Sequence, residues 1–248
     1  MAKQTSIITL KGNIGKLNFY KTKDGYQVRE KGGVSRSRIM NDPKYARTRE
    51  NIAEFKTNAA AVKLVKDTIR PATVNISDSR IHQRLIRRLL EILRTDPVNR
   101  RGERMVSEGD WTLIEGMEIN NQVSLGSVLK EEIQLQDSAA AWEVSINPFL
   151  PSDFLLIPDG ATHFRIFVAG ASFNFETGTK SFVQMSSVDL LLSQPTQALN
   201  LSVQKSSLND PHKILLVGID FQQIVNGEHY KFNNTAHNSA VILKSEKS

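Results

Sequence analysis

An apolar pattern with helical spacing begins near residue 43. Asp42 is a good N-cap, and Pro43 suits the first helical position, where its missing N–H has no partner to lose. The helix is expected to end at Arg70, because Pro71 cannot continue it. Its apolar residues recur every three to four positions and predict one buried stripe. These residues are Ile52, Phe55, Ala59, Val62 and Ile69.

A second helical pattern lies between a polar connector over residues 72–79 and the stop signal Asp96-Pro97. Its apolar residues again recur at helical spacing, and arginines occupy most of the remaining surface. Two helices joined by a connector of this length pack most simply as an antiparallel hairpin. The apolar face consists of Ile81, Leu85, Leu89 and Ile92, widened by Ile86, Leu90 and Leu93.

A β-hairpin is predicted ahead of the helices. The segments 17–20 and 26–29 are rich in aromatic and β-branched residues, and Lys21-Thr-Lys-Asp-Gly25 separates them. Asp24-Gly25 favours a turn, because glycine tolerates positive φ. The expected N-terminal module is therefore a β-hairpin followed by a helical hairpin.

The second half of the chain has a different pattern, with short β-type runs about ten residues apart. Residues 97–107 contain proline, glycine and several arginines and have no periodicity, so the sequence predicts domains 1–106 and 107–248. Such strands, separated by turn signals, are typical of an antiparallel β-sandwich. The predicted class is thus α+β, and residues 126–141 fit either a short helix or a strand pair. The expected strands include 111–114, 142–146, 154–157, 164–168, 172–175, 182–185, 188–192, 199–203, 214–219 and 240–243.

Charge divides the chain in the same place. Residues 1–106 carry 24 Lys and Arg against 10 Asp and Glu, a net charge of +14, whereas residues 107–248 carry 8 against 16, a net charge of −8. This asymmetry favours an anionic partner for the first half, or contact between copies of the chain. Neutralisation of one half by the other within a monomer is the simplest alternative.

Most catalytic chemistries lack a sequence signature here. The chain has no cysteine, which excludes disulfides, thiolate metal sites and a cysteine nucleophile. The five histidines show no helical zinc spacing, and Gly12-Asn-Ile-Gly15-Lys16 does not meet the P-loop pattern. We therefore expect no enzyme activity, cofactor or metal. The first residues lack the apolar core of a signal peptide and no run is long enough to span a membrane, so the expected location is the cytoplasm, without membrane contact.

Arginines of the first half are the candidate binding residues. The guanidinium group matches phosphate oxygens in a bidentate manner, and arrays of such contacts bind nucleic acid through counterion release. We expect a non-enzymatic intracellular protein that contacts nucleic-acid phosphates without sequence specificity. The candidate residues are Arg36, Arg38, Arg47, Arg49, Arg80, Arg84, Arg87 and Arg88.

Two other functions fit the same sequence. In a structural or self-assembling protein, the basic half of one copy would contact the acidic β half of its neighbour. A β-sandwich that binds a small ligand or carbohydrate has only Trp111 and Trp142 in its favour, and no small-molecule ligand is predicted.

The N-terminal segment also resembles a group of uncharacterised Bacteroidetes proteins. The resemblance is carried by GNIGKLNFY (12–20), DGYQVRE (24–30) and DPKYARTRENIAEF (42–55), and it covers about residues 11–70. Members of the group share a glycine-lysine β segment, a basic turn and a helix, sometimes followed by a β-rich half. No activity is established for the group, so the resemblance implies no functional residue.

Overall fold

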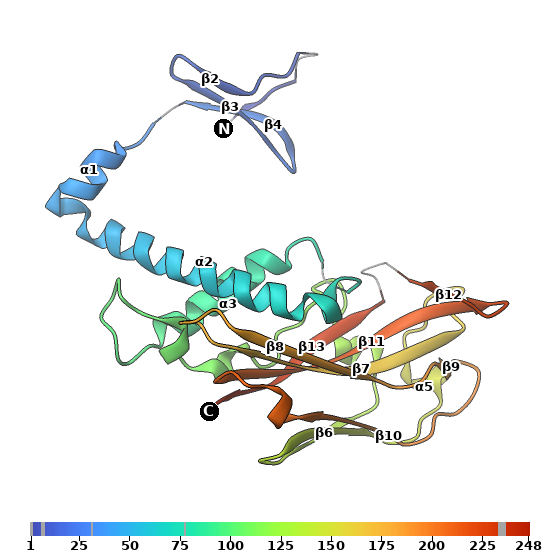
Figure 1. The fold of residues 1–248 in the computed structure, drawn as a ribbon. Helices are drawn as coiled ribbons and strands as arrows, with labels where there is room; N and C mark the ends of the chain where they lie inside the picture. Colours follow the sequence, from blue (N-terminus) through green and yellow to red (C-terminus); the bar gives the residue numbers. More distant parts are fainter. Residues whose placement is uncertain (1, 6–7, 31, 77, 233–236) are drawn as a thin grey trace. The chain divides into compact units, whose positions relative to one another are not determined.

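The computed structural model describes residues 2–5, 8–30, 32–76, 78–232 and 237–248 (Figure 1). The chain forms two compact units, Met1–Glu50 and Asn51–Ser248. Helices and antiparallel sheets are both present, which confirms the α+β class. None of the described helices is long and apolar enough to cross a membrane.

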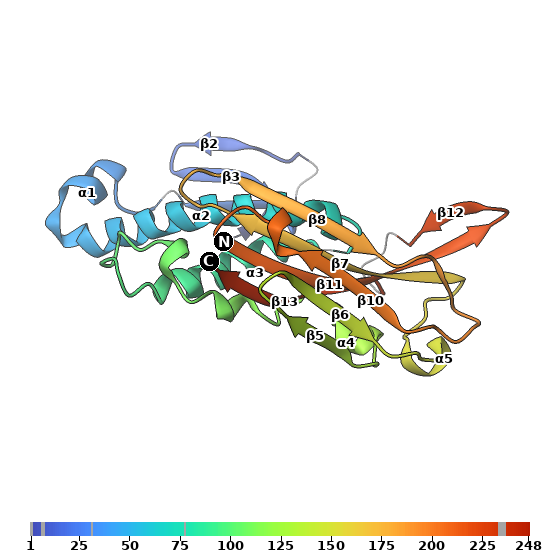
Figure 2. The ribbon, with the colours of Figure 1, turned by 60° about the horizontal axis from the view of Figure 1, so that its bottom comes forward.

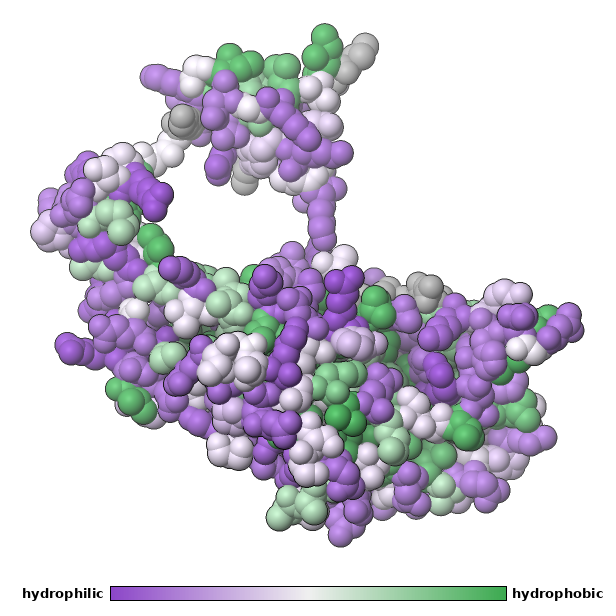
Figure 3. Space-filling view, in the orientation of Figure 1, coloured by the Kyte–Doolittle hydropathy of each residue, from purple (hydrophilic) through white to green (hydrophobic). Residues whose placement is uncertain are grey.

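Residues 1–50 form a small antiparallel sheet followed by short helices. The strand order is β1-β4-β3-β2, and β3 pairs with β4 from Leu17↔Glu30 to Thr22↔Gly25. This register confirms the predicted hairpin, and Gly25 adopts the expected positive φ of 107°. None of the described residues in this unit is buried, and Figure 3 shows apolar side chains on its surface. The elements are β1 (Ala2–Lys3), β2 (Gly12–Ile14), β3 (Leu17–Thr22), β4 (Gly25–Glu30), α1 (Arg36–Asn41) and η1 (Pro43–Tyr45).

The long helix α2 (Ala46–Thr73) differs from its prediction in its start, its end and its buried stripe. Asp42 does cap a helical turn with Pro43 at its start, but this turn is η1 and α2 begins after it. Pro71 lies within the last turn of α2, where its missing N–H removes only one intrahelical hydrogen bond, so the helix continues to Thr73. The buried stripe also differs, because Ile52 and Phe55 are each 50% exposed. The buried residues are Glu54, Asn58, Ala61, Val62, Val65, Thr68, Ile69, Ala72 and Thr73.

Helix α3 (Ile81–Arg94) follows its prediction closely. The helix ends before Asp96, and Thr95 is its C-cap. Its contact with α2 includes a hydrogen bond from Asn58 Nδ2 to the Ile86 carbonyl of 2.9 Å. The predicted apolar face is confirmed, since Ile81, Leu85, Leu89 and Ile92 are all buried.

Six strands form the central sheet of residues 51–248. The order is β12-β11-β7-β8, with β13 also paired to β11 and β9 to β7, and every pairing is antiparallel. Strands β7 and β8 form a hairpin, with residues 174–179 as the connection. Strand bounds are β7 (His163–Phe173), β8 (Lys180–Ser186), β9 (Leu190–Leu191), β11 (His212–Val225), β12 (Glu228–Lys231) and β13 (Ser239–Lys247).

A second sheet has three strands in the order β10-β6-β5. The two faces of the central sheet enter different apolar clusters. Phe167 and Leu216 pack against α2 and α3, whereas Val168 and Leu215 pack towards the three-stranded sheet. Residues 51–248 therefore form three layers, with the central sheet between the helices and the smaller sheet (Figures 1 and 2). The smaller sheet consists of β5 (Ile133–Asp137), β6 (Ala141–Ile146) and β10 (Leu199–Gln204).

Short helical turns connect these layers. The segment Trp111–Ile114 is a 3-10 helix, not the predicted strand, because the Asp110 side chain accepts a hydrogen bond from Thr112 N and starts the turn. The ambiguous segment 126–141 contains both the end of a helical turn and a strand. The turns are η2 (Val106–Glu108), η3 (Trp111–Ile114), α4 (Leu125–Val128), α5 (Pro151–Phe154) and η4 (Lys205–Ser207).

The division into units falls inside α2, whereas the sequence predicts a boundary between residues 106 and 107. Val65 and Leu89 of the helices share one apolar cluster with Phe173 and Ile242 of the central sheet. The helices therefore cover the sheet, and their apolar faces have no separate core to bury them.

Candidate interaction surfaces

The four candidate arginines of residues 1–50 have different environments. Arg36 is exposed, whereas Arg38 and Arg47 each contact an acid on their own helical segment, Asp42 at 3.4 Å and Glu50 at 3.2 Å. Arg49 donates to two backbone carbonyls, those of Ile39 and Asp42, at 2.8 and 2.9 Å. Arg49 thus holds the turn before α2 together and has little freedom to bind a ligand.

Arg84 is a structural residue. Its guanidinium group contacts the Asp78 carboxylate at 2.7 Å and also donates to the backbone carbonyls of Glu118 and Ile119. Asp78 is buried and accepts a second hydrogen bond from Asn121 N at 2.8 Å. These contacts join the start of α3 to the segment after η3. The sequence could not show this, because the partner carbonyls lie more than thirty residues away along the chain.

The structure brings Arg84, Arg87 and Arg88 together in a polar hollow of about 430 Å³. Glu91 contacts both Arg87 and Arg88, at 3.1 and 3.2 Å, and offsets part of their charge. Burial raises the pKa of Glu118 on the opposite wall, although a hydrogen bond from Leu125 N and the charge of Arg84 reduce the shift. The hollow is thus lined by three arginines and two acids, Glu91 and Glu118. Arg80 is exposed at the N-cap of α3.

Further cations on the helices were not among the candidates. We call α2 from Asn51, α3 and the loop to Arg104 the basic layer, because residues 51–104 carry 12 Lys and Arg against 6 Asp and Glu. Several of its cations are exposed and form no ion pair with any described residue. The net charge of the first half indicates these cations, but the candidate residues are all arginines and include no lysine. The unpaired cations include Lys56, Lys63, Lys66, Arg70 and Arg80.

The opposite side of the central sheet carries the opposite charge. Residues 131–160, which include β5, β6 and α5, contain six acidic residues and no Lys or Arg. We call this segment, with the neighbouring strand β10, the acidic layer. Only Asp137 has an ion-pair partner within the described chain, Lys205 at 2.8 Å. The other acids are Glu131, Glu132, Glu143, Asp153 and Asp159.

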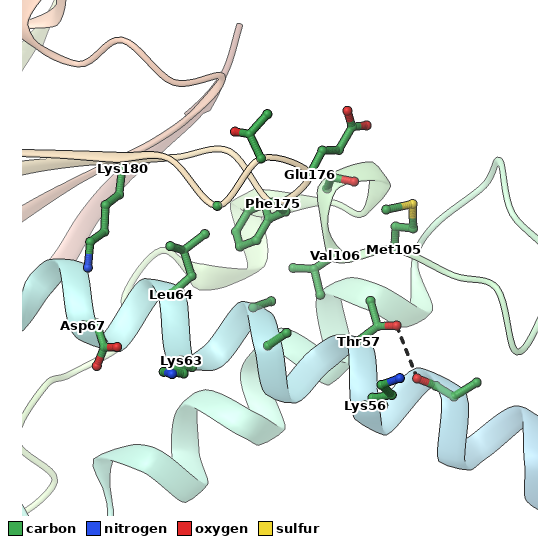
Figure 4. Close-up of a pocket in the computed structure, with 16 residues that line it drawn as sticks. Lys56, Thr57, Lys63, Leu64, Asp67, Met105, Val106, Phe175, Glu176 and Lys180 are labelled. Carbon is green, nitrogen blue, oxygen red and sulfur yellow. Dashed lines mark hydrogen bonds between the residues drawn. The ribbon is translucent and has the colours of Figure 1, made fainter.

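An apolar groove of about 770 Å³ runs along α2 in the basic layer. Leu64 on α2, Phe175 after β7 and Val106 line it (Figure 4). Alanines of α2 leave the floor shallow and open. Lysines extend from both walls, together with Asp67 and Glu176. The alanines are Ala53, Ala60 and Ala61, and the lysines are Lys56, Lys63 and Lys180.

One wall of the groove is fixed by aromatic packing. The Phe175 ring lies 5.4 Å from Trp111 and 5.1 Å from His212, measured between ring centroids. Burial lowers the pKa of His212, and its Nε2 lies 2.9 Å from the Ser107 carbonyl. His212 is therefore a neutral core residue at physiological pH, with Nε2–H as the donor. The wall is preformed and does not depend on a ligand.

Other candidate chemistries find little support in these positions. Trp111 and Trp142 are 4% and 0% exposed, so neither side chain offers a stacking surface to a carbohydrate. Within the described residues, no group of three or more His, Asp or Glu side chains could hold a metal ion. No protein-family model matches the chain, and no significant match to it is found among curated proteins or solved structures.

Proposed function

We propose that the chain is a non-enzymatic, self-associating protein in which the basic layer of one copy contacts the acidic layer of the next. The observation behind this proposal is the opposite charge of the two outer layers of residues 51–248. Residues 51–104 have a net charge of +6, and residues 131–160 have a net charge of −6. Since the central sheet lies between them, the two layers cannot neutralise each other within one copy.

Such a contact is heterologous, because two different surfaces of the same protein meet. Repetition closes a ring or extends a filament, depending on the rotation between copies. The proposal treats the two sheets as the predicted β-sandwich, and the apolar cluster between them supports this. The basic residues 1–50, with 12 Lys and Arg against 4 Asp and Glu, add further positive charge to each copy. Association of this kind weakens as salt screens the charges.

Charge reversal tests the proposal. One variant carries Lys63→Glu, Lys66→Glu and Arg70→Glu in the basic layer, and another carries Glu132→Lys, Glu143→Lys and Asp153→Lys in the acidic layer. Nuclease-treated wild-type protein is expected to associate in about 50 mM salt and to dissociate in about 500 mM salt, as measured by sedimentation velocity. Each variant alone is expected to remain monomeric.

Mixing the two variants provides the decisive comparison. Each variant retains one native layer, and the three reversals bring the net charge of the other layer from +6 or −6 to zero, so copies of one variant no longer attract each other. The remaining native basic layer and native acidic layer belong to different molecules, so the mixture is expected to form heterodimers. Wild-type protein that stays monomeric in low salt contradicts the proposal.

A second candidate function is the binding of nucleic-acid phosphates by the same basic layer. The polar hollow lined by Arg84, Arg87 and Arg88 supports it, because guanidinium groups bind phosphate oxygens well. Fluorescence anisotropy with labelled random-sequence DNA and RNA over a salt series tests this function. Binding should weaken linearly with salt on logarithmic axes and should be lost when Arg87→Glu and Arg88→Glu reverse the charge of the hollow. The acidic-layer variant is the control and should bind at least as well as wild type.

A further inference from the structure

The acidic layer contains a segment that is both apolar and acidic on its surface. In residues 150–159, Leu150 is 39% exposed and Leu156 is 47% exposed. Asp153 and Asp159 are also exposed and have no ion-pair partner in the described parts of the chain. Two exposed leucines and two unpaired carboxylates give this segment an amphipathic surface.

This segment is held in place by its backbone. Leu156 N donates to Val128 O at 2.9 Å, and Lys130 N donates to Phe154 O at 2.9 Å. Leu155 between them is buried in the apolar cluster below the central sheet. The neighbouring leucines are therefore presented on a rigid turn, so binding costs little ordering of this segment.

The groove along α2 has complementary properties. Its floor is apolar and open, because alanines occupy the middle of α2, and its rim carries three lysines against two acids, Asp67 and Glu176, a net charge of +1 (Figure 4). The lysines are Lys56, Lys63 and Lys180. None of these lysines forms an ion pair with a described residue. Leucines flanked by carboxylates complement the apolar floor and the lysines of this groove.

We propose that this groove receives residues 150–159 of a second copy. Leu150 and Leu156 contact the alanine floor, and Asp153 and Asp159 pair with the lysines of the rim. The same copy cannot supply the segment, because α2 and Leu155 lie on opposite faces of the central sheet. The inference rests on the proposed self-association and names the contact that carries it.

Substitutions in the groove and in the segment test this contact by sedimentation equilibrium. Ala60→Trp fills the groove, and Leu156→Ser removes one apolar knob. Each is expected to raise the dissociation constant of self-association at least about tenfold. The matched controls are Ala59→Trp, on an exposed position of α2 outside the groove, and Leu191→Ser, on a leucine that is 40% exposed elsewhere. Both controls are expected to associate as wild type.

Cysteine pairing locates the contact directly, because the natural chain has no cysteine. Proteins with Ala60→Cys and Leu156→Cys are mixed in low salt under mild oxidation, and a disulfide-linked heterodimer is expected. A mixture of Ala60→Cys with Leu17→Cys, in the N-terminal sheet, should not crosslink. Preferential crosslinking of that second mixture would place residues 1–50 in the groove and overturn the inference.

The two proposals fail in different ways. If charge reversal abolishes association while Ala60→Trp and Leu156→Ser leave it unchanged, the groove contact is wrong and self-association stands. If wild-type protein does not associate in low salt, both are overturned.

Discussion

Arg84 stabilises the fold through a buried carboxylate and two backbone carbonyls. Its guanidinium group contacts a buried carboxylate, Asp78, at 2.7 Å and two backbone carbonyls after η3. Removing it leaves the buried charge of Asp78 without its cation. Arg84→Met is therefore expected to lower the free energy of unfolding by about 3 kcal/mol, measured by urea denaturation.

Arg87 is the matched control for Arg84. It lies one turn away on α3, its side chain is 85% exposed, and its contact with Glu91 is on the surface. Arg87→Met should change the free energy of unfolding by less than about 0.5 kcal/mol. Equal effects of the two substitutions would show that the Asp78–Arg84 pair is not needed for stability.

Asp96 makes the fold sensitive to acid. Burial raises its pKa, but hydrogen bonds from Met105 N, from Asn99 and from Val98 N outweigh that effect and lower the pKa from 3.8 to about 2. Because the folded pKa is below the unfolded value, the ionised carboxylate stabilises the fold above pH 4 or so. This stabilisation, about 1 to 2 kcal/mol after screening, is lost as the pH falls from about 4 to about 2.

Asp96→Asn tests this pH dependence. The amide cannot accept all the hydrogen bonds, so the variant should lose about 1 to 2 kcal/mol at neutral pH. Its stability should also fall less between about pH 4 and pH 2 than that of wild type, as followed by urea denaturation at each pH. Asp67→Asn, at an exposed position of α2, is the control and should retain the wild-type profile.

At the scale of elements, regular patterns were predicted well and packing partners were not. The apolar face of α3 is predicted correctly, because its buried leucines and isoleucines recur at helical spacing and lie on one side of the helix. In α2 the buried stripe includes two polar residues, Glu54 and Asn58. Their burial is compensated by hydrogen bonds to other segments, because Glu54 accepts from Gly102 N and Asn58 donates to the Ile86 carbonyl. A single sequence cannot show such partners.

The turn after η2 packs tightly on α3. A Cβ added to Gly109 would lie 2.1 Å from the Ile92 carbonyl oxygen, which is backbone and cannot move aside. The φ of Gly109 is −79°, which other residues adopt without strain, so a substitution reports the contact alone. Gly109→Ala is expected to destabilise the protein by about 2 to 3 kcal/mol in thermal or urea unfolding.

Gly126 in α4 provides the comparison for Gly109. No atom from another segment lies within 4 Å of the Cβ position there, and the backbone is helical. Gly126→Ala should be neutral or slightly stabilising, because alanine loses less conformational freedom on folding. If Gly109→Ala also leaves the free energy of unfolding unchanged, η2 can move away from α3 without loss of stability.

For the whole molecule, the sequence predicted the sign and size of the charge asymmetry but not its arrangement. Counting showed a basic first half and an acidic second half. The order of the strands decides that the helices cover one face of the central sheet and that β5, β6 and β10 lie beyond the other. The contacts of Arg49 and Arg84 with backbone carbonyls could not be predicted, because backbone carbonyls carry no sequence signal.

The two units should also differ in stability. No described residue of 1–50 is buried, whereas β7 and β11 contain many fully buried side chains. A small sheet without a buried face is marginally stable, so its backbone hydrogen bonds open often.

In hydrogen exchange of the full chain in about 500 mM salt, amides of β3 and β4 are expected to exchange at least about a hundredfold faster than those of β7 and β11. High salt weakens the proposed contact between copies, so the measurement reports the isolated chain. Equal protection of the two units in high salt would mean that residues 1–50 are covered within a single copy. Protection of β3 and β4 that appears only in low salt would mean that a neighbouring copy covers them.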